Sequence, residues 1–224
     1  MALKIYSAKD IQTKPVTALV YAKAGSGKTY TLGQLSGRTV ILDIDKTAHV
    51  LKDNPNVIII DIDIYDTVNS MNEAIQWIME NKDRFDNVCV DNVSELQNCI
   101  LSAYGKAGRN DGVPSQADYQ KYQFKLMDYL RQLKFTGKNV ILTAWEELVT
   151  ITSPTGEQYT AFMPRIQKTV RDSVCGLCDV VGHFDFDEHG ERFIRLQTMK
   201  NVYAKNQIDD RKACKQNELV NGGK

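Results

Sequence analysis

The chain lacks the features that mark secreted and membrane-spanning proteins. Its 5 cysteines in 224 residues are too sparse for a disulfide scaffold, and their odd number predicts reduced thiols. No apolar run approaches the roughly 18 residues that a membrane span needs. The first residues contain no apolar segment of the kind found in signal peptides, so we expect none here. We therefore expect a cytoplasmic protein without a membrane partner.

The chain also lacks net charge. Its 28 Lys and Arg residues balance 28 Asp and Glu residues, which excludes a protein that holds nucleic acid by bulk positive charge alone. The apolar fraction of 42% is ordinary for a globular protein, and the length predicts one domain. We expect that domain over residues 1–206, followed by a polar tail over residues 207–224 that is free to move.

Short apolar runs alternate with helical patterns along most of the chain. Continuous apolar runs of this length are typical of strands covered on both faces, as in a parallel sheet. The alternation predicts an α/β fold, with a mostly parallel central sheet and helices on both faces. The five predicted strands are residues 16–22, 39–45, 56–64, 87–91 and 139–145.

Helix signals and turn signals fill the intervals between these runs. Ser70 and Glu73 have the spacing of a capping box and predict a helix from Ser70 to about residue 82. A regular apolar stripe predicts another helix over residues 117–134, and Pro164 predicts the start of a third. Turn residues at 153–157 and 187–191 predict two hairpins, which we expect as antiparallel additions to the sheet edge.

The strongest motif follows the first predicted strand. The sequence AKAGSGKT fits the phosphate-binding pattern [A/G]-x-x-x-x-G-K-[S/T], with alanine at the first position. Glycines let main-chain amides turn toward phosphate oxygens, the lysine binds the β- and γ-phosphates, and the threonine hydroxyl binds Mg²⁺. The motif predicts a nucleotide as ligand, and by itself it does not distinguish ATP from another nucleoside triphosphate. Its residues are Ala22, Lys23, Ala24, Gly25, Ser26, Gly27, Lys28 and Thr29.

Carboxylates at strand ends complete the predicted site. Asp91 ends the apolar run VCVD, the pattern of a residue that holds Mg²⁺ through a water. Hydrolysis also needs a carboxylate that positions the attacking water. Asp45, at the end of the second strand, is the favoured candidate. Glu95, four residues beyond Asp91, is the alternative.

The order of these motifs resembles the RecA-like recombination ATPases over residues 15–206. More narrowly, the chain resembles the small phage-encoded AAA-family nucleotide-binding proteins that are associated with single-strand annealing proteins. The resemblance implies ATP and Mg²⁺ as cofactors and self-assembly into a ring or a filament. It also implies single-stranded DNA as a partner, together with a single-strand annealing or single-strand-binding protein.

The resemblance implies roles for further residues. The strand after the phosphate loop ends in a catalytic acid in this family, which corresponds to Asp45. Thr143 lies near the family's polar sensor. Two DNA-binding loops correspond to residues 106–117 and 147–162, although the second contains no Lys or Arg. Lys200 and Lys205 lie where basic groups contact the ATP of a neighbouring subunit.

Three other interpretations stay open. Lys23 also matches the phosphate loop of the partition and septum-site ATPases, where that lysine acts across a dimer. A nucleotide-dependent interaction protein with little hydrolysis would have the same motifs. A nucleotide kinase would need an arginine-rich lid, and the only nearby candidate segment, around Arg109, contains few arginines.

Cys175 and Cys178 have no second pair to complete a zinc site, so we expect them to pack in the core.

Overall fold

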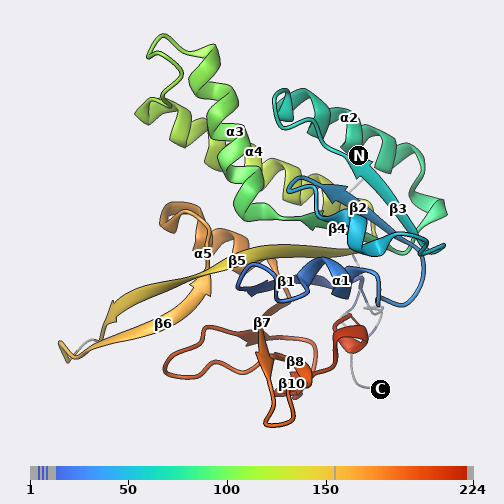
Figure 1. Ribbon diagram of the computed structural model, residues 1–224, viewed down its shortest axis with the longest axis vertical. Helices are drawn as coiled ribbons and strands as arrows, with labels where there is room; N and C mark the ends of the chain where they lie inside the picture. Colours follow the sequence, from blue (N-terminus) through green and yellow to red (C-terminus); the bar gives the residue numbers. More distant parts are fainter. Residues whose placement is uncertain (1–4, 6, 8, 10–13, 154, 221–224) are drawn as a thin grey trace.

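Six parallel strands form the centre of one ten-stranded sheet (Figure 1). The computed structural model describes residues 5, 7, 9, 14–153 and 155–220. The parallel strands lie in the spatial order β3-β2-β4-β5-β1-β7, so β5 separates β1 from β4. Their bounds are β1 Thr17–Ala22, β2 Thr39–Asp43, β3 Val57–Asp61, β4 Asn87–Asp91, β5 Asn139–Thr152 and β7 Val180–Phe186.

Antiparallel strands extend this sheet toward the C-terminus. β6 (Gln158–Pro164) pairs with the outer half of β5, and the two form an arm that projects from the body (Figure 1). β8 (Arg192–Arg195) pairs with β7, and β10 (Ala213–Cys214) pairs with β8, while β9 (Lys205–Asn206) pairs with the start of β7. Both predicted hairpins are present. However, β7 runs parallel to β1 and belongs to the central sheet, which the prediction of a purely antiparallel addition missed.

Helices cover both faces of the sheet, so the predicted fold class is confirmed. Alternate strand residues face opposite ways: Leu19 and Tyr21 belong to one core, and Ala18 and Val20 to the other. The first core is closed by α2 (Thr67–Glu80), α3 (Val93–Ala107), α4 (Gln116–Phe135) and α5 (Lys168–Leu177). The second is closed by α1 (Lys28–Leu32) and the C-terminal segment. Among the described residues, none of the helices combines the length and the hydropathy needed to cross a bilayer.

Two predicted helix starts are wrong. α2 begins at Thr67, and Ser70 lies inside it, where its hydroxyl accepts a hydrogen bond from the Asp63 amide at 3.0 Å instead of capping the helix. Pro164 ends strand β6, because this strand continues pairing up to that residue, and α5 begins at Lys168. α4 has the capping box, formed by Ser115 and Asp118.

The C-terminal segment is packed into the fold over its described part. Residues 207–220 include β10 and the short 3₁₀ helix η4 (Gln216–Glu218), whereas a free polar tail was expected from this segment. Leu219 is fully buried and Val220 is 8% exposed, both against the α1 face of the sheet. Their apolar burial anchors the segment. Residues 221–224 lie outside the described residues.

Candidate functional site

The turn between β1 and α1 has the geometry of a phosphate-binding loop. Gly25 and Gly27 have φ angles of 76° and 95°, a backbone conformation that glycine adopts without strain. The hydroxyl of Ser26 is buried and has no hydrogen-bond partner among the described residues. A buried hydroxyl without a partner is unfavourable, so the loop fits an oxygen-rich anion such as a phosphate chain.

Lys28 spans the open end of this turn. Its ammonium donates hydrogen bonds to the main-chain carbonyls of Lys23, at 2.7 Å, and Ala22, at 3.2 Å. The side chain is buried, and burial lowers the pKa of the amine, while the nearby Asp91 and Asp45 carboxylates act in the opposite direction. The protein's own carbonyl groups therefore hold the Lys28 ammonium group inside the loop.

Asp91 is the centre of the hydrogen-bond network beside the turn. The Thr29 hydroxyl donates to one carboxylate oxygen at 2.6 Å, and the Thr143 hydroxyl donates to the other. The sheet explains this meeting, because β5 lies between β1 and β4 and pairs Thr143 with Val20. Asp91 is 1% exposed, and burial raises the pKa of its carboxyl to about 6. The two predicted magnesium ligands, Thr29 and Asp91, are thus in direct contact.

Asp45 lies next to this network. Its carboxylate accepts hydrogen bonds from the Asn92 amide at 2.6 Å and from the Thr47 hydroxyl at 2.8 Å. Thr47 in turn contacts the Thr29 hydroxyl at 2.8 Å. Asn92 directly follows the strand-ending Asp91, where the resemblance places a small polar residue, whereas no sequence signal marked Thr47.

Glu95, the alternative acid, is directed along its own helix. One of its carboxylate oxygens accepts from Asn98 at 3.0 Å, and the other lies 3.6 Å from the Cys99 sulfur. These partners lie three and four residues further along α3, on the same helix face. Only the main-chain amide of Glu95 joins the network, by donating to Asn92 at 2.8 Å. The structure therefore brings the carboxylate of Asp45, and not that of Glu95, into the hydrogen-bond network of Thr29.

A cavity of about 530 Å³ opens above the turn. Asp45 and the phosphate-loop residues Gly25, Lys28 and Thr29 line it, together with Trp145 from β5. Arg192 from β8 also lines it. Arg192 was not predicted as part of the site, since no motif surrounds it. The cavity is large enough for a small ligand.

The late lysines and the cysteines lie elsewhere. Lys200 forms an ion pair with Glu157 of the β5–β6 arm at 2.9 Å. Lys205 donates to three carbonyls at the end of α5, the shortest contact being 2.6 Å to Cys178. Cys175 and Cys178 are buried in the core, as predicted. Contacts of either lysine with a neighbouring subunit stay a prediction.

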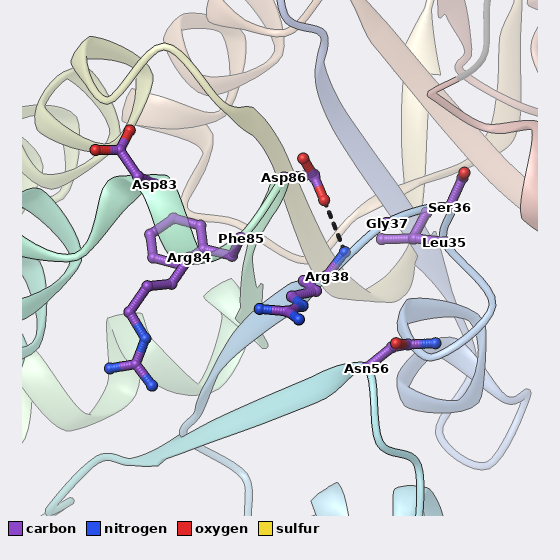
Figure 2. A pocket seen from close by; sticks show the side chains of 9 residues that line it. All are labelled: Leu35, Ser36, Gly37, Arg38, Asn56, Asp83, Arg84, Phe85 and Asp86. Atoms are coloured by element: carbon purple, nitrogen blue, oxygen red, sulfur yellow. Dashed lines mark hydrogen bonds between the residues drawn. The ribbon is translucent and has the colours of Figure 1, made fainter.

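A second hollow, of about 490 Å³, lies at the opposite edge of the sheet (Figure 2). Its lining comes from the segments that precede β2, β3 and β4. The main-chain amide of Arg38 donates to the Asp86 carboxylate there at 2.8 Å. In open α/β sheets, ligands bind outside the carboxyl ends of the strands. This hollow lies at the amino ends, so it is separate from the site around Lys28.

Comparisons with known proteins place the chain in a family. Residues 14–208 match the family described as AAA domain. Among solved structures, the chain is similar to the crystal structure of the RadB recombinase, with 15% identity and a TM-score of 0.48. That match covers 81% of this chain and 80% of the other. No curated protein matches the chain.

Proposed function

The chain belongs to the AAA domain family, and on that premise we propose that it is a Mg²⁺-dependent ATPase of RecA-like type. One observation supports this most strongly: the Thr29 hydroxyl and the Asp91 carboxylate lie 2.6 Å apart beside the glycine-rich turn. Hydroxyl and carboxylate oxygens are ligands that Mg²⁺ prefers in nucleotide sites. The Thr143 hydroxyl donates a hydrogen bond to the other carboxylate oxygen of Asp91.

In this proposal the chain's own residues bind and orient the nucleotide. Lys28 exchanges its two carbonyl partners for phosphate oxygens, and the Ser26 hydroxyl gains the partner that it lacks. Gly25 leaves room for the phosphates, because nothing lies within 4 Å of the point where a side chain would begin. When bound, Mg²⁺ neutralises charge on the phosphates.

Asp45 is the proposed catalytic acid, which orients the attacking water. Its two hydrogen bonds, from Asn92 and Thr47, fix the carboxylate beside the Thr29 hydroxyl. A carboxylate held in one orientation positions a water more effectively than a mobile one does. Glu95 is occupied by Asn98 and Cys99 and is the less suited candidate.

Three variants test these roles by measuring Mg²⁺-ATP binding and turnover side by side. Lys28→Ala should lose both. Asp45→Asn should bind Mg²⁺-ATP within about threefold of wild type but turn over at least about a hundredfold more slowly. Glu95→Gln serves as the matched control and should retain both activities. Full turnover by Lys28→Ala would refute the ATPase proposal, and loss of turnover in Glu95→Gln alone would move the catalytic role to Glu95.

We further propose that the protein assembles with itself, as a ring or filament, and acts with single-stranded DNA in recombination of the phage type. The projecting β5–β6 arm supports this, because it exposes Leu148 and presents two strands away from the body (Figure 1). A single-strand annealing or single-strand-binding protein is the proposed further partner. Two aromatic side chains of the arm make contacts within the chain: Phe162 stacks on His183, and the Lys200 ammonium lies over the Tyr159 ring.

Particle mass and ATP turnover should be measured together, with and without ATP and single-stranded DNA. The proposal expects a larger particle with ATP and faster turnover with DNA. A change of mass without any effect of DNA on turnover would instead indicate a nucleotide-dependent interaction protein. Transfer of phosphate to a nucleoside acceptor would indicate a kinase.

A further inference from the structure

Arg192 places a guanidinium against the phosphate loop from a distant part of the chain. It is the first residue of β8, and its main chain is held by antiparallel pairing with Phe186 of β7. A side chain built at Gly27 would begin only 2.6 Å from an Arg192 terminal nitrogen. Because β7 pairs with β1, the strand that leads into the loop, the sheet positions the main chain of Arg192 within reach of Gly27.

No described residue neutralises Arg192. Its guanidinium forms no hydrogen bond and no ion pair within the described part of the chain, and its side chain is exposed to the cavity above the loop. The Asp187 carboxylate in the same hairpin is occupied by the main-chain amides of His189 and Glu191. By contrast, Arg195 of the same strand is paired with Asp185 at 2.6 Å.

Resting on the proposed nucleotide site, we propose that Arg192 binds the polyphosphate of the nucleotide held by the same protomer. It acts as a second cation beside Lys28. An arginine fork binds phosphate oxygens through two parallel hydrogen bonds, which a lysine cannot do. The contact with Gly27 favours phosphate over base as its ligand, since this glycine belongs to the turn that surrounds the phosphates.

The alternative is that Arg192 only covers the loop. An exposed guanidinium with a merely steric role would leave affinity almost unchanged when it is truncated. A cation on the polyphosphate makes charge-assisted hydrogen bonds, whose loss weakens binding by about 10- to 100-fold. The two interpretations therefore differ by at least about an order of magnitude in the dissociation constant.

The test measures binding of Mg²⁺-ATP and of inorganic tripolyphosphate to wild type, Arg192→Ala and Arg192→Lys. Arg131→Ala is the matched control, because Arg131 is an exposed arginine on α4 and its removal changes the net charge equally. We expect Arg192→Ala to lose about 10- to 100-fold in affinity for both ligands, and Arg192→Lys to lose less. Arg131→Ala should stay within twofold of wild type.

Two results would overturn the inference. One is Arg192→Ala binding Mg²⁺-ATP within twofold of wild type. The other is a loss for ATP with no loss for tripolyphosphate, which would assign the guanidinium to the nucleoside. Melting temperatures without nucleotide establish whether each variant folds. If Arg192→Ala does not fold, Arg192→Lys still provides the test. Failure of the proposed function is distinguishable, because wild type would then bind Mg²⁺-ATP no better than Lys28→Ala.

Discussion

Replacing Asp91 by Asn should stabilise the ligand-free protein at neutral pH while removing its affinity for Mg²⁺-ATP. The carboxylate is 1% exposed, and burial raises its pKa from 3.8 to about 6. A raised pKa means that the ionised form is less favourable in the folded protein than in the unfolded chain. The ionised Asp91 carboxylate therefore lowers the free energy of unfolding of the wild-type protein when no metal is bound.

The size of the effect follows from the shift and from the hydrogen bonds. A shift of about 2 units corresponds to about 3 kcal/mol of destabilisation by the charge at pH 8. Asparagine removes the charge but offers one acceptor oxygen to the Thr29 and Thr143 hydroxyls, which now occupy two. Losing one such bond costs about 1–2 kcal/mol. The net gain for Asp91→Asn is about 1–2 kcal/mol at pH 8, or about 2–8 °C in melting temperature for a protein of this size.

The sign of the difference should reverse in acid. A carboxyl with a raised pKa contributes stability below its unfolded value of 3.8, and this contribution is lost as the pH rises through about 6. At pH 4 the wild-type carboxyl is protonated in the folded protein, so the charge penalty is absent. At this pH the only remaining effect of Asp91→Asn is the loss of one hydrogen bond, so the variant should be less stable than wild type.

Thermal and urea unfolding in EDTA, without nucleotide, between pH 4 and 8 measures this difference. Asp128→Asn, an exposed carboxylate on α4, is the control and should change the melting temperature by less than about 1 °C. Asp91→Asn should also show no stabilisation by added Mg²⁺-ATP. A variant that is less stable than wild type across the whole pH range would refute the argument that burial of the charge dominates.

Three further predictions concern the loop, the C-terminal segment and pH. Gly27→Ala should lose about 1–2 kcal/mol of stability, because the φ of 95° at this position is strained for alanine. Its affinity for Mg²⁺-ATP, measured by calorimetry, should fall at least about tenfold. Gly176→Ala in helix α5, where open space surrounds the glycine, is the control and should leave stability unchanged. Leu219→Ala should lose about 2–4 kcal/mol in urea unfolding, whereas the exposed Lys212→Ala should change stability little; equal stability would contradict the anchoring of the C-terminal segment. Affinity for Mg²⁺-ATP should fall up to tenfold per pH unit below about 6 as Asp91 takes up a proton, and a flat profile would argue against metal binding there.

The parts of the site that follow strand ends could be predicted from the sequence. Periodicity identifies the parallel strands, and the carboxyl ends of parallel strands meet at one edge of the sheet. Asp91 lies 62 residues after Thr29, and Thr143 lies 52 residues after Asp91. Asp91 and Thr143 belong to apolar runs, and Thr29 follows the glycine-rich turn after the first run. The sheet converts that shared position into contact.

Arg192 could not be predicted, because its position depends on strand order. Local periodicity indicates that residues around 180–186 form a strand, but not that this strand pairs with β1. That pairing alone brings the β7–β8 hairpin beside Gly27. A single arginine after a turn has no local pattern that distinguishes it from a solvated surface residue.

The missed helix starts and the misjudged C-terminal segment have separate physical reasons. Ser70 and Pro164 both match helix-start signals, yet α2 already begins at Thr67, and Pro164 is the last residue of strand β6, which pairs with β5 up to that point. Leu219 and Val220 are only two apolar residues in a polar segment, too few to form a periodic pattern. Their burial follows from an uncovered strip of sheet next to α1, which the sequence pattern does not describe.

Strand β5 joins two distant regions without a break. Thr143, near its base, donates to Asp91, and the same strand runs on to Thr152 at the end of the arm. At about 3.3 Å per residue, the nine steps from Thr143 to Thr152 span about 30 Å. Arg171 of α5 forms an ion pair with Glu147, partway along this strand. A tilt of a few degrees at the base would sweep the tip through ångströms, so a very small rearrangement near Thr143 would be amplified at the outer surface.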